Sequence, residues 1–228
     1  MYNQNIWALC RSERHRQERR AQTTAFYLDP GARDIVLDVG CSEGFVSSYL
    51  LEANFVVGVD TSIESLLIAK QKTKHSNIDF IRADAADLPF RECSFNKAAM
   101  LELLEHLPKE AQKKVCQEVD RILKRKGVIV LSVPYKEQIT YIRCVHCGKL
   151  TPLWGHLCSM DEEKVTNLLS SHYTLVACCH LPNVGLISLA SVFECLPLRL
   201  WFPLNNLLGK FRKGYWIILK YRKEKNNP

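Results

Sequence analysis

The sequence predicts a doubly wound α/β fold whose sheet is mostly parallel. Two observations support this prediction. First, short apolar runs alternate with segments in which apolar residues recur every three or four positions, as expected for strands that alternate with helices. Second, the apolar run 34–39 leads into a loop with Gly40 and Gly44, after which helical spacing resumes. A strand, a glycine loop and a helix start in this order commonly place backbone N–H groups beside a ligand.

The expected elements of the first half follow one another closely. A helical lead-in precedes the strand 34–39 and a helix over 45–51, and further strands are expected at 55–59, 78–81, 95–101 and 128–133. Thr61 and Glu64 have capping-box spacing, which predicts a helix with Ile63, Leu66 and Leu67 facing inward. Pro108 is expected to open the next helix, and Gly127 to close it.

The second half is less regular. Ser159 and Glu162 again have capping-box spacing, and strands are expected at 173–180 and 214–221. Between these strands lies an apolar segment over 184–211 that prolines interrupt. We therefore expect one domain over 1–228, with a lead-in over 1–33, a ligand-binding half over 34–134, an insert over 135–160 and a C-terminal half over 161–228.

Composition is typical of a globular protein, with 47% hydrophobic and 24% charged residues. No apolar stretch follows Met1, so we expect no secretory signal, and the ten cysteines then indicate reduced thiols in a cytoplasmic protein. The net charge of +7 is concentrated at both ends, in 11–20 and 210–225. These ends are either solvated termini or a surface that meets anionic lipid or phosphate, and a peripheral membrane contact is one interpretation.

The glycine loop differs from the usual phosphate-binding loops. A dinucleotide fingerprint requires G-x-G-x-x-G, but this chain has Ser42 and Phe45 where the second and third glycines would stand. The Gly-Lys-Ser/Thr ending of a P-loop is also absent. Asp60 ends the second strand, twenty residues after Gly40, where an acid can accept hydrogen bonds from a ribose. The alternative for Asp60 is a simple helix N-cap.

These motifs, taken together, resemble the class I S-adenosylmethionine-dependent methyltransferases, in the branch related to quinone biosynthesis. The resemblance extends over about 34–134, and its segments are LDVGCSEG (37–44), VGVDTS (57–62), ADAADLPF (83–90), CSF (93–95), LEHL (104–107) and LKRKGVI (123–129). Family members often have glycine where Ser42 stands and an acid where Asn96 stands. The resemblance implies a Rossmann-like seven-stranded sheet with an antiparallel last strand.

The resemblance also implies roles for particular residues. Asp38 would order the loop and the contacts to the ammonium group of S-adenosylmethionine, and Asp60 would bind its ribose. Asp84 and Ala85 would bracket the adenine, while Leu101 and Glu102 would lie near the sulfonium. The complete expected cofactor set is Asp38, Gly40, Cys41, Gly44, Asp60, Thr61, Asp84, Ala85, Leu101 and Glu102. Glu105 and His106 are candidates for a general base, but their place at a helix start explains them better; the catalytic residues thus stay unassigned.

A cysteine-containing insert follows Pro134. Its residues Cys144, Cys147, His156 and Cys158 have the types and spacing of a Cys₃His zinc site, with His146 as an alternative ligand. Such a zinc ion would be structural, because four protein ligands leave no coordination position open. The alternative is a group of ordinary thiols with a surface histidine, and the sequence leaves both interpretations open.

The apolar segment 184–211 is too interrupted for a membrane-spanning helix. It is either a lid over the methyl acceptor or an interfacial segment beside the basic cluster that starts at Lys210. We expect a methyltransferase that acts on a small hydrophobic or lipid-like acceptor. The alternatives are a cofactor-binding module without catalysis and an RNA methyltransferase. Few aromatic residues are interleaved with the basic ones, which argues against nucleic acid as the partner.

Overall fold

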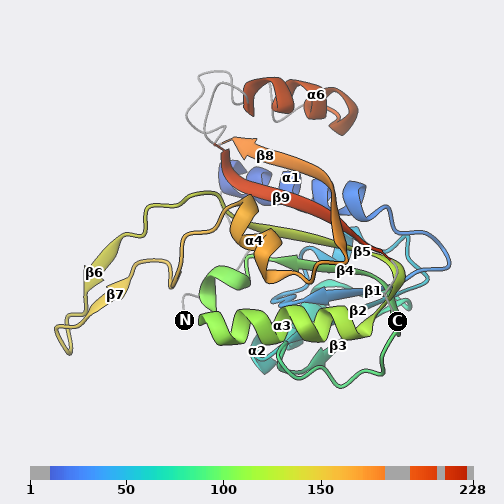
Figure 1. Cartoon of the computed structure of the whole chain (residues 1–228), viewed down its shortest axis with the longest axis horizontal. Helices are drawn as coiled ribbons and strands as arrows, with labels where there is room; N and C mark the ends of the chain where they lie inside the picture. The colour runs from blue at the N-terminus through green and yellow to red at the C-terminus, as the bar shows by residue number, and fades with distance from the viewer. Residues whose placement is uncertain (1–10, 183–195, 210–213, 225–228) are drawn as a thin grey trace.

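The computed structural model describes residues 11–182, 196–209 and 214–224. Its core is a seven-stranded sheet in the order β3-β2-β1-β4-β5-β9-β8. The strands β1 to β5 pair in parallel, and β9 is antiparallel to both of its neighbours. The predicted Rossmann-like doubly wound sheet with an antiparallel last strand is therefore confirmed (Figure 1).

The elements follow the chain in alternating order. They are α1 (Arg11–Leu28), β1 (Ile35–Val39), η2 (Ser47–Tyr49), β2 (Phe55–Asp60), α2 (Ile63–Lys72), β3 (Ile78–Arg82), β4 (Phe95–Leu101), η3 (Leu104–His106), α3 (Lys109–Ile122), β5 (Leu123–Pro134), β6 (Tyr141–Arg143), β7 (Leu150–Pro152), α4 (Glu162–Leu168), β8 (Tyr173–Pro182), α6 (Leu198–Gly209) and β9 (Gly214–Lys223).

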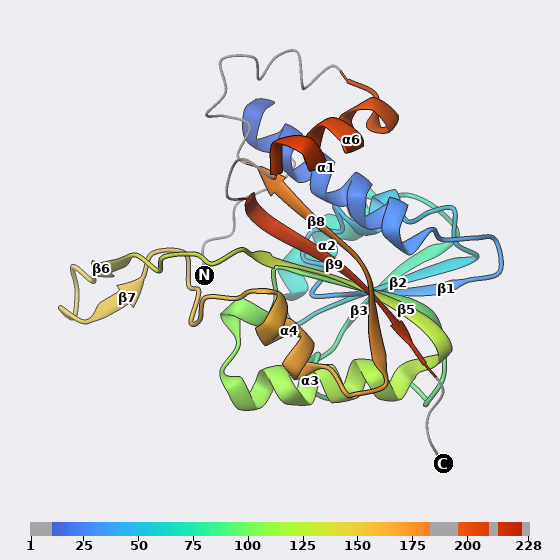
Figure 2. The ribbon, with the colours of Figure 1, turned by 45° about the horizontal axis from the view of Figure 1, so that its top comes forward.

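Helices cover both faces of the sheet, which creates two apolar cores. Residues of α1, α2 and α6 pack in one cluster, with Leu28, Leu66 and Trp201 among them. Residues of α3 and α4 pack in the other, with Val119 and Val165 among them. Figure 2 shows α1 and α6 on one side of the sheet and α3 and α4 on the other.

The structure corrects several expectations for the helices. The helix expected over 45–51 is only the short 3₁₀ helix η2. The Ser48 hydroxyl donates to the carbonyl of Phe45, which would accept from the N–H of Tyr49 in an α-helix, and the N–H of Tyr49 donates to the carbonyl of Val46 instead. The helix α3 ends at Ile122, so Gly127 lies inside β5 and does not close the helix.

Both predicted capping boxes are displaced along the chain. The N-cap of α2 is Ser62 rather than Thr61, and that of α4 is Asp161 rather than Ser159. In each case the side-chain oxygen accepts from the N–H group three residues on, which satisfies one free donor of the first turn. In α2, Leu66 is buried as expected, whereas Ile63 and Leu67 are exposed.

Two short strands, β6 and β7, pair as a separate antiparallel hairpin. The hairpin projects away from the sheet, on the left of Figure 1. It lies within the insert expected over 135–160.

Candidate active site

The strand register brings the predicted cofactor residues to one edge of the sheet. Val39 at the end of β1 pairs with Val59 of β2 and with Met100 of β4. The next residue of each strand or loop, Gly40, Asp60 and Leu101, therefore lies at the same carboxyl edge. Ligands of doubly wound sheets bind at this edge, next to the point where the strand order reverses.

The loop after β1 folds tightly over the end of β2. The N–H groups of Gly40 and Cys41 both donate to the carbonyl of Val59, at 2.9 Å each. Gly40, Ser42 and Gly44 have φ angles of +72°, +47° and +74°. Ser42 thus adopts a left-handed conformation that glycine would adopt without strain, which gives a physical reason for glycine at this position in the family that the sequence resembles.

Asp60 links this loop to the start of α2. One carboxylate oxygen accepts from the N–H of Ser42 and the other from the N–H of Ser62, both at 2.9 Å. A carboxylate can accept about four hydrogen bonds, so two acceptor positions remain for ligand hydroxyls. Thr61, predicted to assist in cofactor binding, is exposed beside Asp60.

Asp38 lies buried beneath the loop. Its carboxylate accepts a hydrogen bond of 2.6 Å from the Ser47 hydroxyl. Burial raises the pKa of Asp38 to about 6, and the charge of Asp60 adds to this effect, while Ser47 and Arg20 oppose it. A positively charged group near Asp38 would therefore favour its ionised form.

Two residues of the predicted cofactor set lie in the core rather than on the open edge. A Cβ atom on Gly44 would lie 2.8 Å from Phe80 and 3.0 Å from Ala69, so Phe80 and Ala69 fill the space beside this glycine. The Cys41 side chain is buried as well, with its sulfur directed toward Gly58. In this structure the contacts of Gly44 and Cys41 are thus packing contacts within the core.

Asp84 and Ala85 follow β3 at the rim of the same edge. Asp84 is exposed, and one of its carboxylate oxygens accepts from the N–H of Ala86 at 2.9 Å. Asp84 also forms an isolated β-bridge with Asp87. These contacts fix the turn after β3 and leave the other carboxylate oxygen of Asp84 available.

Glu102 is held from three sides at the end of β4. Its carboxylate accepts from the Ser132 hydroxyl at 2.8 Å and from the indole N–H of Trp216 at 2.5 Å, and it pairs with Arg20 at 3.3 Å. The Arg20 guanidinium also lies over the Trp216 ring, 4.8 Å from its centroid. Arg20, Ser132 and Trp216 were missed by the sequence interpretation because no local pattern connects these three distant positions.

Glu105 is the most unusual acid near this edge. It has no exposed surface, and among the described residues no other residue donates a hydrogen bond to either carboxylate oxygen. Burial raises the pKa of Glu105 well above its ordinary value, and the nearby Glu102 raises it further. The adjacent His106 is exposed, and its Nδ1 lies 3.2 Å from the carbonyl oxygen of Gly155.

The insert does not assemble the predicted zinc ligands. Cys144 and Cys147 lie at the tip of the β6–β7 hairpin, where the N–H of Gly148 donates to the carbonyl of Cys144 at 2.9 Å. N–H groups of Cys147 and His146 face the Cys144 thiol and lower its pKa. The turn therefore has the form of a metal knuckle, but only half of the predicted ligands lie in it.

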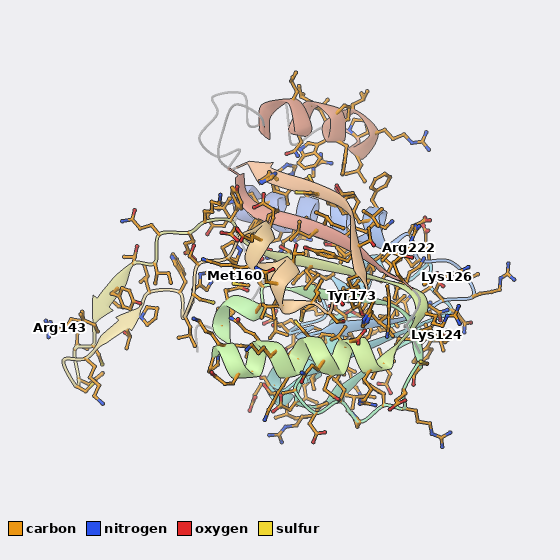
Figure 3. All side chains as sticks on the ribbon, viewed as in Figure 1. Lys124, Lys126, Arg143, Met160, Tyr173 and Arg222 are labelled. Atoms are coloured by element: carbon orange, nitrogen blue, oxygen red, sulfur yellow. The ribbon has the colours of Figure 1, made fainter. Side chains whose placement is uncertain are left out.

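The other two predicted ligands lie at the body of the protein. Cys158 is half-buried, its sulfur 3.6 Å from that of Met160, and it accepts from the side-chain N–H of Gln112 at 3.0 Å. His156 pairs with Glu137. Figure 3 shows Arg143 on the projecting hairpin, well separated from Met160. The expectation of one Cys144, Cys147, His156 and Cys158 tetrad therefore does not fit this structure, because the hairpin carries its cysteines away from the other two ligands.

The apolar segment 184–211 lies partly outside the described residues. Its described part contains α6, which packs on α1 and β8 through the buried Trp201 and through Asn205, whose side-chain N–H donates to the carbonyl of His180 at 3.0 Å. The roles of lid and of membrane contact stay predictions. Among the described residues, no helix is long and apolar enough to cross a bilayer.

Comparisons with known proteins agree with this geometry. Residues 36–127 match the model of a methyltransferase domain family. A probable S-adenosylmethionine-dependent methyltransferase of Mycobacterium tuberculosis is 28% identical over 153 residues, which cover 66% of this chain and 52% of that protein. A demethylmenaquinone methyltransferase of Porphyromonas gingivalis is 26% identical over 159 residues, which cover 63% of this chain and 62% of that protein. The chain thus spans roughly half the length of these curated relatives.

A solved structure shows the same fold. The 1,6-didemethyltoxoflavin-N1-methyltransferase of Burkholderia thailandensis, solved with bound 1,6-didemethyltoxoflavin and S-adenosylhomocysteine, has a TM-score of 0.64 and 16% identity. The match covers 97% of this chain and 82% of that one. This chain therefore has the same Rossmann-like fold. Residues 36–127 match a methyltransferase domain, and the relatives of this chain include probable S-adenosylmethionine-dependent methyltransferases, so the resemblance found in the sequence is confirmed.

Proposed function

We propose that this chain is an active methyltransferase that binds S-adenosylmethionine at the carboxyl edge of β1, β2, β3 and β4. The observation that carries the proposal is the strand register, which brings Asp38, Gly40, Asp60 and Leu101 together. Asp84 completes the edge at the end of β3. The family match supports the same ligand, because the matched residues 36–127 contain all five positions.

Each residue would contribute a separate function to cofactor binding. The two remaining acceptor positions of Asp60 suit the two ribose hydroxyls, and Asp84 suits the exocyclic amine of adenine. The ammonium group of the methionine part would stabilise the ionised form of the buried Asp38. The close turn at Gly40, where an added Cβ would lie 3.3 Å from the Leu103 side chain, lets the backbone approach the ligand.

The chemistry requires positioning more than a protein nucleophile. The bound cofactor supplies a methyl group that is already activated by a positively charged sulfur. The chain has to hold an acceptor in line with that methyl group and exclude water. Glu102, fixed by Arg20, Ser132 and Trp216, is rigidly placed for such positioning because its three partners come from three different elements.

We further propose a small hydrophobic or lipid-like acceptor. Two observations support this class. The named activity of the relative from P. gingivalis is the methylation of a demethylmenaquinone. In addition, α6 presents Leu200 and Leu207 with more than half of their surface exposed. The ring of Phe202, also in α6, lies 5.2 Å from that of the exposed Phe26 of α1.

A deletion strain tests the acceptor class. Comparison of its lipid and aqueous extracts with those of the parent strain should reveal a compound lighter by one CH₂ group in the lipid extract. Expression of the wild-type chain should restore the methylated compound, whereas the Asp60→Ala variant should not. A precursor that appears only in the aqueous or RNA fraction would contradict the proposed acceptor class.

A further inference from the structure

Three side chains outside the predicted cofactor set converge beside η3. Glu105 and His106 come from η3, and His156 comes from the segment between β7 and α4. The two segments are joined by a hydrogen bond of 2.7 Å from the N–H of Leu157 to the carbonyl of Glu105. One ligand atom from each of the three side chains lies within 4.8 Å of the others. This spacing allows all three atoms to bind one ion after small adjustments of the side chains.

The carboxylate of this cluster has no partner in another described residue. Glu105 has no exposed surface, and within the described part of the chain neither of its oxygens accepts a hydrogen bond from another residue. Buried polar atoms are nearly always paired, and an unpaired one in a folded protein suggests an absent ligand or ion.

The two imidazoles are oriented as metal-binding histidines are. The Nδ1 of His106 lies 3.2 Å from the carbonyl oxygen of Gly155, which can only accept, so Nδ1 is the donor. The Nδ1 of His156 is paired in the same way with the carboxylate of Glu137. In a neutral imidazole, the other nitrogen, Nε2, then carries a free electron pair. Metal-bound histidines typically donate their second N–H to a carboxylate or a carbonyl in this manner.

We propose that Glu105, His106 and His156 form a binding site for one divalent transition-metal ion. Two imidazole nitrogens and one carboxylate favour Zn²⁺, Fe²⁺, Co²⁺ or Mn²⁺ over Ca²⁺ and Mg²⁺, which prefer oxygen ligands. His106 is the exposed member of the cluster, so an ion can enter from solvent. Three protein ligands leave further coordination positions for water or for an oxygen of another molecule.

This site differs from the zinc knuckle that the sequence suggested. It uses His156 but none of the cysteines, and its other ligands come from η3. Glu137 acts as a positioning residue, because it touches the imidazole of His156 at the nitrogen that would not bind the metal.

Metal titration of the purified full chain tests the proposal. Chelator-treated protein is titrated with Zn²⁺ by calorimetry and with Co²⁺ by absorption spectroscopy, in the absence of S-adenosylmethionine. We expect one equivalent of metal ion to bind. The absorption spectrum of the Co²⁺ complex should be that of nitrogen and oxygen ligands, without the charge-transfer bands of thiolate ligands. His106→Ala and Glu105→Gln should each weaken binding by at least about 100-fold, and Glu137→Gln by about 10–100-fold. His106 is exposed, so its variant should fold normally.

The double variant Cys144→Ser/Cys147→Ser is the matched control. It should bind the ion with unchanged affinity. The proposal is overturned if the wild type binds no ion, if His106→Ala binds as tightly as the wild type, or if the cysteine variant alone abolishes binding. Because the titration requires neither cofactor nor methyl transfer, its result is separate from that of the proposed function.

Discussion

Two glycine turns show how differently two parts of this protein are held. Gly44 and Gly148 have nearly equal φ angles of +74° and +70°. An added Cβ on Gly44 would meet Phe80 at 2.8 Å, whereas one on Gly148 would meet no atom within 4 Å. The first turn is fixed by the packed core below the carboxyl edge, and the second belongs to a projecting hairpin. Motif residues therefore converge in the first region and separate in the second.

The largest predicted effect compares these two glycines directly. Gly44→Ala should lower the free energy of unfolding by about 2–5 kcal/mol, since it adds a steric clash to the cost of a left-handed alanine. Gly148→Ala has only the conformational cost, and the hairpin can open locally, so the global loss should be about 1 kcal/mol or less. Urea denaturation measures both. Equal losses would contradict the difference in packing.

A second prediction concerns the pH dependence of cofactor affinity. Burial raises the pKa of Asp38 to about 6 in the free protein, and a bound ammonium group would lower it. The affinity for S-adenosylmethionine should therefore reach its maximum well above pH 6. It should fall by up to about tenfold per pH unit as the pH decreases below 6. Calorimetry between pH 7.5 and about 5 in buffers of different ionisation enthalpy would detect the proton release.

The Asp38→Asn variant is the control for this experiment. It should bind the cofactor more weakly at neutral pH and lack the pH dependence. A wild-type affinity that stays constant between pH 7.5 and about 5 would show that Asp38 does not contact the ammonium group.

The smallest predicted effect concerns the cysteines of the hairpin. The Cys144→Ser/Cys147→Ser variant should change the free energy of unfolding by no more than about 0.5 kcal/mol, because both residues lie at the hairpin tip. The buried Cys116→Ser, a matched thiol in the core, should cost about 1–3 kcal/mol. A large loss in the hairpin variant, reproduced by a chelator, would restore the structural zinc knuckle.

Most of the fold could be predicted from the sequence. All seven strands of the main sheet were expected, because buried strands leave short apolar runs with clear ends. The first residues of the helices were harder to predict from the sequence. Thr61 and Ser62 are both good N-cap residues, and only the three-dimensional structure decides between them. The prediction of a helix over 45–51 was wrong because the Ser48 hydroxyl forms a local hydrogen bond that apolar periodicity does not reveal.

The site was only partly predictable. Strand ends converge by register in any parallel sheet, so Asp38, Asp60 and Asp84 could be placed at one edge from the sequence. The zinc tetrad rested on spacing alone, and spacing does not reveal the direction in which a hairpin projects. Pairs such as Arg20 with Glu102 and Glu137 with His156 depend on the tertiary packing of distant segments, so no local sequence pattern predicts them.

The central claim is that the carboxyl edge of the sheet binds S-adenosylmethionine through Asp60. Its most direct test is calorimetric titration of the cofactor into the wild type, Asp60→Ala and Asp79→Ala, a matched exposed acid on β3 that pairs with Lys70. We predict one equivalent bound by the wild type and by Asp79→Ala, and affinity lower by about 10–100-fold in Asp60→Ala, as expected for lost hydrogen bonds to a charged group. Undetectable binding to the wild type, or equal affinity in Asp60→Ala, would contradict the claim.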